Sequence, residues 1–384
     1  MPTIIETLAR ELGQKEAYVA NVADLLDQGN TIPFIARYRK ELHGAMDDQT
    51  IRTLADRLSY LRSLEARRGE VKSAVETQGK LTEELSAAID AAQTLAEVED
   101  LYRPYRPKRR TRASMARDKG LEPLAQEIFA QTAKTPPEAL AAAYLDAEKG
   151  VETVEDALQG ASDILAEQIS DDADLRKRLR AQLTRQAVLR SRAAKEDEDS
   201  VYRLYYDFSQ SVARLQSHQV LALNRGEKEG FLKVSLEADR AAVLQTLFRA
   251  VVRPGSAAMA FVRAAAEDAW DRLLAPSLER ELRGALTEDA CEAAIRNFAL
   301  NLRPLLLQPP VKGRVTMGLD PGYRNGCKVA VVDGTGKVLG TAVVYPTFSQ
   351  RKKEEAIDCL AALIRKHGVA HIAIGNGTAS RETE

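Results

Sequence analysis

An aspartate at the end of an apolar run is the residue of this chain best suited to chemistry. The run Val315–Leu319 leads into Asp320, and a Pro-Gly turn, a short basic loop and a second apolar run follow, as VTMGLDPGYRNGCKVAVVD. Short apolar runs bounded by turn residues predict two β-strands. A carboxylate fixed at the tip of a strand can be aimed at a metal ion or at a phosphate group. Asp320 is therefore the first candidate for a functional residue.

Three uses of Asp320 fit this position. In a nuclease, the carboxylate would bridge two Mg²⁺ ions about 4 Å apart, which requires further carboxylates from other strand ends. In an actin-like kinase, the turn glycines after the acid would let backbone amides hold phosphate. In a purely structural role, Asp320 would accept hydrogen bonds from its own loop. The other strand ends must decide between these three uses.

The end of the fourth predicted strand argues against the nuclease. A resolvase-type nuclease has an acid there, but the chain reads IAIGNGTASRETE, with Gly375 and Asn376 after the strand. The next acid, Glu382, lies beyond the turn. One carboxylate is a poor two-metal site. We therefore expect no catalytic residue, neither a metal ion nor a cofactor, and Asp320 as a vestigial acid or as part of a site that accommodates phosphate.

A second candidate site is a cluster of basic and aromatic residues in Leu101–Gly120. This segment, LYRPYRPKRRTRASMARDKG, has eight Lys or Arg against the single acid Asp118, in a chain of net charge −1. Arginine pairs with phosphate and tyrosine stacks on bases, so the mixture is typical of nucleic-acid binding. Alternatively, the arginines pair with acids of the same protein or solvate a loop. The predicted nucleic-acid-binding residues, including two cations that flank the Asp320 turn, are Tyr102, Arg103, Tyr105, Arg106, Lys108, Arg109, Arg110, Arg112, Arg324 and Lys328.

A short helix near the N-terminus also combines cations with aromatic residues. A Gly-Asn pair ends one predicted helix, and Thr31 and Pro33 begin the next, PFIARYRKEL. Short helices joined by a tight glycine turn are compatible with a helix-turn-helix. Ordinary packing in a helical bundle explains the pattern as well. The side chains in question are Phe34, Ile35, Arg37, Tyr38, Arg39 and Lys40.

The remaining pattern predicts mainly helices as far as a Pro-Pro pair at residues 309–310. Asp47–Ala92 reads as a helical hairpin interrupted near Gly79. Asp171–Asp199 reads as acids around one amphipathic helix with leucine every fourth residue. Its arginines either form ion pairs on a solvated helix or bind RNA. A short strand is expected at Phe231–Leu236.

After Gly313 the apolar period changes from that of a helix to that of a strand. Three antiparallel strands, a helix and a parallel strand beside the first would form the first half of an RNase H-like sheet. The predicted fold class is a mainly α multi-helix region with a helix-turn-helix, followed by an α/β RNase H-like domain that is incomplete at its C-terminus. The predicted division is residues 1–200 (helical region), 201–312 (second helical segment and linker) and 313–384 (RNase H-like domain).

Composition is that of an ordinary globular protein. Hydrophobic residues make up 45% and charged residues 29%, and the near-zero net charge excludes a histone-like polycation. No apolar run approaches the roughly 18 residues of a membrane span, and the N-terminus lacks the features of a signal peptide. Cys291, Cys327 and Cys359 are scattered, which argues against a zinc knuckle or a disulfide framework. We expect a cytoplasmic protein without membrane contact.

Five stretches of sequence resemble the bacterial Tex family of transcription accessory proteins. They are IPFIARYRKELHG, YRPYRPKRRTRASMARDKGLEPLA, QGASDILAE, ALNRGEKEGFLKV and MGLDPGYRNGCKVAVVD. The resemblance implies a helical N-terminal region with a helix-turn-helix, then a YqgF/RuvC-like domain that has lost the resolvase acids. It also implies that this chain is the N-terminal part of a longer protein, which continues with helix-hairpin-helix elements and an OB-fold RNA-binding domain.

The sequence thus predicts a non-enzymatic transcription accessory factor that binds nucleic acid. RNA, DNA or both would be bound, and the transcription machinery is the expected protein partner. Two alternatives stay open: a metal-dependent RNase H/RuvC-like nuclease that uses Asp320, and a structural scaffold that docks RNA polymerase or ribosomal partners.

Overall fold

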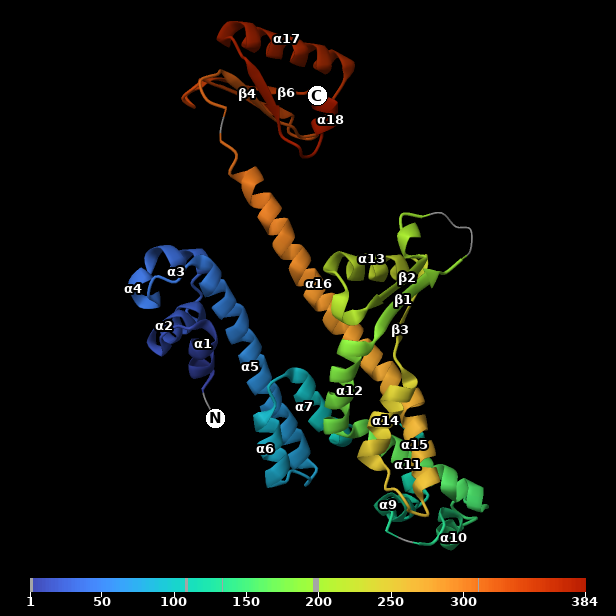
Figure 1. Ribbon diagram of the computed structural model, residues 1–384. Helices are drawn as coiled ribbons and strands as arrows, with labels where there is room; N and C mark the ends of the chain where they lie inside the picture. Colours follow the sequence, from blue (N-terminus) through green and yellow to red (C-terminus); the bar gives the residue numbers. More distant parts are fainter. Residues whose placement is uncertain (1–2, 108–109, 133, 196–199, 310) are drawn as a thin grey trace. The chain divides into compact units, whose positions relative to one another are not determined.

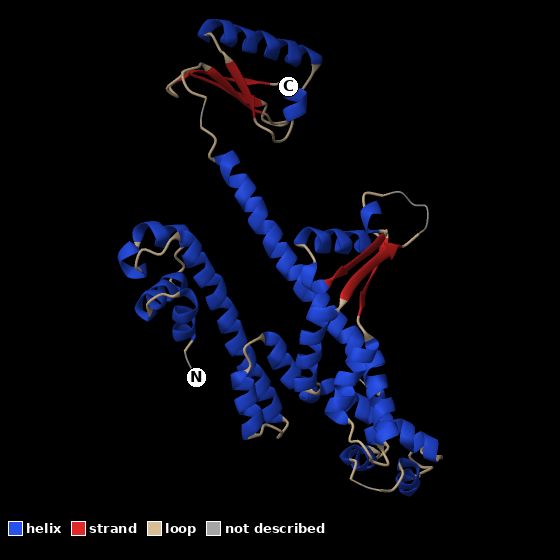
Figure 2. Cartoon of the chain, in the orientation of Figure 1, coloured by secondary structure: helices blue, strands red, loops and turns tan. Residues whose placement is uncertain are grey.

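The structure is a computed structural model that describes residues 3–107, 110–132, 134–195, 200–309 and 311–384. The chain divides into two compact units, residues 1–294 and 295–384 (Figure 1). Helices make up most of the first unit, and a mixed sheet is the centre of the second (Figure 2). The predicted fold class, a mainly helical region followed by an α/β domain, is confirmed. The predicted boundaries at residues 200 and 312 stay predictions.

The first helices pack around a small core of their own. Leu8, Val19 and Ile35 are fully buried in it, together with Ile51 and Leu54. These residues follow the helical spacing of the sequence, which gives each helix one apolar face. The helices are α1 (Ile4–Leu12), α2 (Glu16–Asp27), α3 (Ile32–Tyr38), α4 (Lys40–His43) and α5 (Asp48–Thr77).

The predicted third helix differs from the structure in its length. Thr31 and Pro33 begin α3 as expected, but α3 ends at Tyr38 because Arg39 has non-helical backbone angles (φ −131°, ψ 33°). A second, four-residue helix, α4, follows Arg39. The single helix predicted through Leu42 is therefore wrong. The helix-turn-helix role assigned to this region stays a prediction.

A helical hairpin follows, as predicted. The long helix α5 ends at Thr77, and Gly79 adopts a left-handed conformation (φ 66°) that turns the chain back into α6. Glycine reaches this conformation without steric cost. The hairpin consists of α5, α6 (Glu83–Ala91) and α7 (Leu95–Tyr102), continued by the 3₁₀ turn Arg103–Tyr105.

A second helical cluster lies around α11. Its core contains Leu124, Ile128, Ile164, Leu165 and Val262, all almost completely buried. Alanines fill most of the remaining core positions, which lets the helices approach closely. The elements are α8 (Arg112–Asp118), α9 (Glu122–Ala130), α10 (Pro137–Ala141), the 3₁₀ turn Ala142–Tyr144, α11 (Val154–Asp171) and α15 (Met259–Asp268).

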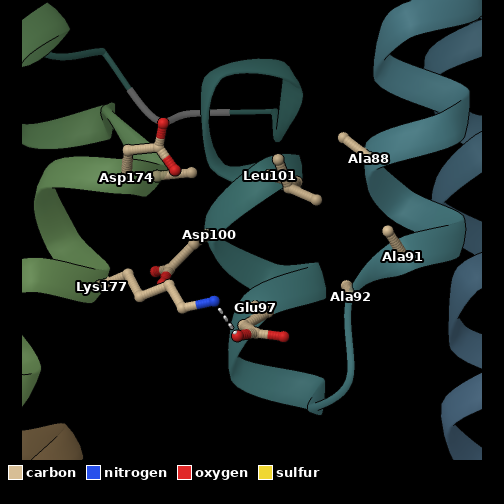
Figure 3. A pocket seen from close by; sticks show the side chains of 9 residues that line it. Ala88, Ala91, Ala92, Glu97, Asp100, Leu101, Asp174 and Lys177 are labelled. Atoms are coloured by element: carbon tan, nitrogen blue, oxygen red, sulfur yellow. Dashed lines mark ion pairs between the residues drawn. The ribbon is translucent and has the colours of Figure 1, made fainter.

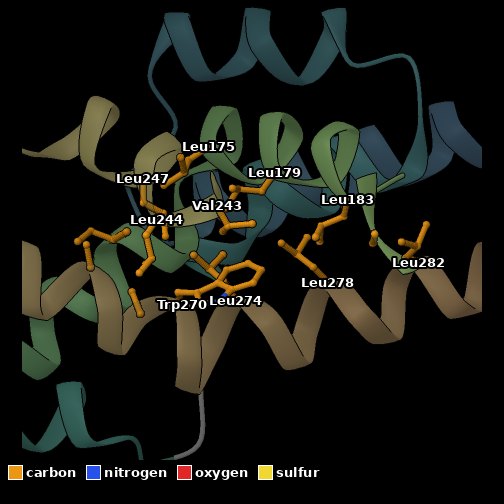
Figure 4. Packing of buried hydrophobic residues seen from close by; sticks show 14 of the residues in the cluster. Leu175, Leu179, Leu183, Val243, Leu244, Leu247, Trp270, Leu274, Leu278 and Leu282 are labelled. Carbon is orange, nitrogen blue, oxygen red and sulfur yellow. The ribbon is translucent and has the colours of Figure 1, made fainter. Parts of the chain in front are cut away.

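The largest core lies between α12, α14 and α16. Leu175, Leu179 and Leu183 of α12 pack in one cluster with Trp270 and Leu278, so the leucine repeat seen in the sequence is the buried stripe of this helix (Figure 4). A π-helical turn interrupts the helix at Trp270. The elements are α12 (Ala173–Gln186), α14 (Arg240–Val251), the π turn Ala269–Leu274 and α16 (Ala275–Leu306).

A three-stranded antiparallel sheet, ordered β2-β1-β3, completes the first unit. The strand expected at Phe231–Leu236 is confirmed as β3 (Leu232–Glu237). The helix expected over Asp174–Lys195 is wrong in its second half, since α12 ends at Gln186 and the chain continues as a strand. The acids that follow it at 196–199 lie outside the described residues. The other elements are β1 (Val188–Ala193), the 3₁₀ turn Arg203–Tyr205, β2 (Asp207–Ser211), the 3₁₀ turn Val212–Arg214 and α13 (Ser217–Lys228).

The second unit contains the predicted half of an RNase H-like sheet. The strand order is β6-β5-β4-β7, with antiparallel β4–β5 and β5–β6 pairs and a parallel β4–β7 pair. Helix α17 covers one face of this sheet, packing Leu360 and Leu363 against the cluster of Met317 and Val329 (Figure 1). The elements are β4 (Thr316–Asp320), β5 (Cys327–Val332), β6 (Val338–Val344), α17 (Gln350–His367), β7 (His371–Ile374) and α18 (Ser380–Thr383).

Across the described residues, no helix is long and apolar enough to cross a membrane.

Candidate functional site

The ends of β4 and β7 lie side by side in the second unit. The backbone N–H of Gly375 donates to the carbonyl of Leu319 (2.8 Å), which continues the parallel ladder past the end of β7. A Cβ at position 375 would lie 4.0 Å from Oδ1 of Asp320. The fold therefore brings the two strand-end positions together as the sequence predicted. The second of these positions has no side chain.

The turn after Asp320 is held in place by contacts of its own. Gly326 has a left-handed backbone (φ 72°), and the ring of Tyr345 packs where its side chain would be. The hydroxyl of Tyr323 donates to the carboxylate of Glu382 (2.7 Å). This hydrogen bond lowers the pKa of Glu382 and raises the pKa of Tyr323. The acid that follows the fourth strand is thus engaged by the turn.

Two exposed cations flank Asp320, as predicted. Lys328 is the direct cross-strand partner of Asp320 in the β4–β5 pair, and Arg324 lies in the turn between these strands. Burial, and then the charge of Asp320, raise the pKa of the Cys327 thiol beside them, so Cys327 stays neutral near neutral pH. The site combines one carboxylate with two cations.

The sheet face opposite α17 is hollow. A depression of about 710 Å³ extends from the Asp320 end of the sheet across all four strands. The face is hollow because small residues occupy its central positions, and its floor is largely apolar. Asp320 and Lys328 lie at one end of the depression. The lining residues are Gly318, Asp320, Lys328, Ala330, Thr341, Val343, Ala373 and Gly375, with their neighbours in the strands.

The described part of the chain contains no group of three or more His, Cys, Asp or Glu side chains placed to hold a metal ion. A two-metal nuclease site needs several carboxylates to converge on the ions. Asp320 has Gly375 at the neighbouring strand end, and Glu382 is bonded to Tyr323. This geometry suits a site that accommodates an anion beside Lys328 and Arg324 better than one that holds two divalent cations.

The basic segment of the first unit separates into exposed and internal cations. Arg106, Arg110 and Arg112 are exposed, and none of them forms an ion pair with a residue that the structure describes. Lys108 and Arg109 lie outside the described residues. Three unpaired guanidinium groups within seven residues leave a strong local positive charge, which is the electrostatic requirement for phosphate binding.

Other residues of this segment are only partly exposed and are engaged by neighbouring side chains of the protein. The Arg103 guanidinium donates to Ser277 (3.2 Å) and pairs with Glu281 (3.5 Å). Burial and the adjoining charge of Arg176 lower the pKa of Arg103. Tyr102 lies under the guanidinium of Arg67, 5.5 Å from ring centroid to Cζ. The nucleic-acid role predicted for Arg103 and Tyr102 stays a prediction.

Tyr105 and Arg117 are likewise engaged within the protein. Tyr105 is half-buried against the α5–α7 hairpin, and its carbonyl accepts a hydrogen bond from Gln78 (2.9 Å). Arg117 pairs with Glu122 (2.5 Å) and Glu167 (2.7 Å). The alternative weighed from the sequence, internal ion pairing, therefore applies to part of the segment.

A buried ionic cluster beside the segment has no counterpart among the sequence predictions. Arg176 is fully buried and pairs with Asp100 (2.8 Å) and Glu281, while Arg180 pairs with the same two acids. Arg176 and Arg180 of α12 are thus ion-paired, as in one of the two interpretations of the sequence, but inside the protein and not on a solvated face. The one local signal is that Arg176 and Arg180 lie one turn apart beside the leucine stripe. Their partners are 76 to 105 residues away, which no local pattern reveals.

A small hollow of about 240 Å³ adjoins this cluster between α6, α7 and α12. Figure 3 shows that Lys177 reaches across it to Glu97, with which it forms an ion pair (2.6 Å). That hydrogen bond lowers the pKa of Glu97. Asp100, which also lines the hollow, forms ion pairs with Arg176 and Arg180. These charged groups of the hollow are thus satisfied within the protein.

Fold and site together define a multi-helical protein that carries an RNase H-like α/β domain without converging carboxylates among its described residues. Three family models match the chain in sequence order: the Tex-like protein N-terminal domain at residues 2–76, the Tex central region at 132–298 and the Tex protein YqgF-like domain at 314–384. The chain belongs to the Tex family. The resemblance seen in the sequence is confirmed.

Curated relatives agree along almost the whole chain. Protein tex of Bordetella pertussis is 47% identical over 99% of this chain and 50% of its own length. The transcriptional accessory protein Tex of Neisseria gonorrhoeae is 41% identical over 99% of this chain and 50% of its own length. The human S1 RNA-binding domain-containing protein 1 is 33% identical over 99% of this chain and 39% of its own length. The chain spans about half the length of these bacterial relatives.

Proposed function

We propose that this chain acts as a nucleic-acid-associated transcription accessory factor without catalytic activity. The observation that carries the proposal is that Arg106, Arg110 and Arg112 are exposed and form no ion pair with a residue that the structure describes, next to cations that are paired internally. Free cations concentrated in one segment attract phosphate, whereas paired ones do not. The printed names of the relatives, a transcriptional accessory protein and an S1 RNA-binding domain protein, support this direction.

The Asp320 turn is proposed as a second contact surface. Lys328 supplies an exposed cation in the lining of the hollow on the sheet, and Arg324 supplies a second one in the turn that follows Asp320. A phosphodiester backbone offers spaced anions that suit such a surface, although Asp320 reduces its net charge. Proteins of the transcription machinery are the proposed partners, and the cytoplasm is the proposed location.

The experiment compares two triple variants of equal charge. Arg106, Arg110 and Arg112 are replaced by Ala in one; the matched control replaces Arg52, Arg185 and Arg249, which are exposed arginines dispersed over α5, α12 and α14. Binding of a fluorescein-labelled single-stranded RNA of about 20 nucleotides is followed by anisotropy. The first variant should bind at least about tenfold more weakly than the control, or ~1.4 kcal/mol. Equal affinity of the two variants would contradict the proposal.

The proposed lack of nuclease activity has its own test. Support comes from Gly375, which stands where a second carboxylate would meet Asp320. The full chain, incubated with Mg²⁺ and structured DNA or RNA, should leave both intact. Cleavage that requires Mg²⁺ and disappears in Asp320→Asn would establish the nuclease instead.

A further inference from the structure

The outward face of α3 carries two aromatic rings. Ile35 points into the N-terminal core and is fully buried, whereas Tyr38 is 61% exposed. Phe34 and Tyr38 lie one helical turn apart, with ring centroids 5.3 Å from each other at an angle of 46°. An outward helix face normally carries polar side chains. Two rings at this place expose stacking surface that the packing of the bundle does not use.

The break after Tyr38 fixes the shape of this surface. Because Arg39 leaves the helical conformation, its guanidinium turns back over the ring of Phe34 (5.0 Å from Cζ to centroid) and donates to the carbonyl of Tyr38 (2.9 Å). One side of the Phe34 ring is thereby covered by a cation. The ring of Tyr38 remains open, and its hydroxyl has no hydrogen-bond partner among the described residues.

Positive charge surrounds the rings. Arg37 and Lys40 are exposed, and neither they nor Arg39 pairs with a carboxylate in the described ranges. Glu41 is the one acid in the α3–α4 segment. Cations beside an open aromatic face are the combination that binds single-stranded nucleic acid, with phosphates on the cations and a base on the ring.

The geometry favours a single strand over a duplex. A helix that reads a duplex enters the major groove and presents hydrogen-bonding groups to base edges. Helix α3 has only seven residues and presents two rings and Arg37 on its outward face. The faces of paired bases are stacked inside a duplex, so an aromatic ring on a helix surface cannot reach them.

We propose that Phe34 and Tyr38, with Arg37, Arg39 and Lys40, form a platform on which an unpaired base of single-stranded nucleic acid stacks. This inference deepens the proposed function, on which it rests, by assigning a further surface and a strand type. It predicts sequence-tolerant binding, because every base has a face that can stack.

The experiment measures the affinity of the full chain for three fluorescein-labelled probes: oligo(U), oligo(dT) and a duplex of mixed sequence. Tyr38→Ala should weaken binding of both single strands by about tenfold. The salt dependence of binding by this variant should equal that of the unaltered chain, since the substitution removes no charge. Tyr38→Phe, which keeps the ring, should recover most of the affinity. Phe298→Ala removes a comparably exposed ring (67%) on α16 and serves as the matched control.

The outcomes separate this inference from the function on which it rests. A full chain that binds none of the probes overturns both. If the chain binds and the arginine triple variant weakens binding while Tyr38→Ala does not, the platform is wrong and the proposed function stands. If Tyr38→Ala weakened binding of the duplex as much as binding of the single strands, the assignment to single strands would be overturned. A loss confined to the single strands supports the platform, and the strand with the larger loss is its preferred ligand.

Discussion

Gly375 at the end of β7 lies directly beside Asp320 at the end of β4, close enough that a Cβ on residue 375 would contact the Asp320 carboxylate at 4.0 Å. The RNase H-like sheet therefore retains the arrangement in which two strand ends could supply two acids. The sequence supplies only one of these two acids, Asp320. Asp320 is typical of the fold, but position 375, where a second acid would complete a metal site, is a glycine.

Restoring an acid at residue 375 should create a cation site. In Gly375→Asp the two carboxylates would share a divalent cation, because two like charges this close are stabilised by Mn²⁺ or Mg²⁺ between them. Millimolar Mn²⁺ should raise the melting temperature of this variant by about 2–4 °C if binding contributes ~1 kcal/mol. The melting temperature is followed by differential scanning fluorimetry.

The matched control for this variant is Gly377→Asp, in which the new side chain points into open space. Mn²⁺ should not change its melting temperature. Adding Asp320→Asn to Gly375→Asp should also remove the response. A response that persists without Asp320 would show that the two strand ends do not form one site.

Breaking the buried cluster around Arg176 should strongly destabilise the protein. Arg176→Ala leaves Asp100 buried with less compensation, and removal of one partner of a buried pair costs about 3–5 kcal/mol. Urea unfolding followed by circular dichroism measures the change in free energy of unfolding. Arg62→Ala, which breaks a pair with Asp27 at the surface, is the control and should have a much smaller effect. Equal effects would contradict the ionic role assigned to Arg176.

The same cluster predicts loss of stability in acid. Burial alone would raise the pKa of Glu281, but the charges of Arg176 and Arg180 lower it below its ordinary value of 4.5. The resulting stabilisation is complete above pH 4.5, where the unfolded chain is also ionised, and is lost as the pH falls through the lower folded-state pKa. Glu281→Gln should flatten the pH dependence of the unfolding free energy in this range. Glu83→Gln, at an exposed position of α6, should not.

The sheet of the second unit was predictable because its signals are local. Apolar runs, the Pro-Gly turn after Asp320 and the glycine turn after Asp333 mark each strand within a few residues of itself. In the small sheet of the first unit, a local signal of this kind marked β3 but not β1 or β2. β1 follows α12 after the single residue Ala187, and its charged residues continue the pattern of the helix. Its pairing with β3 joins residues far apart in the chain, such as Leu189 and Leu236.

The candidate site could be located from sequence, but its free and internal cations could not be told apart. Composition alone identifies the basic segment, and Arg103 and Arg110 look equivalent within it. They differ because Ser277 and Glu281, 174 and 178 residues further along the chain, meet Arg103 and leave Arg110 exposed. Tertiary packing decides which cation is free, so a count of charges in the sequence overestimates the number of free cations in the segment.

The most direct test of nucleic-acid binding through the basic segment is the salt dependence of single-stranded RNA affinity. For the full chain, the logarithm of the association constant should fall linearly with the logarithm of salt concentration, because phosphate binding releases counterions. Replacing Arg106, Arg110 and Arg112 by Ala should reduce the slope by about 2, because each phosphate neutralised on a single strand contributes ~0.7. A variant whose slope and affinity match those of the unaltered chain would contradict the account.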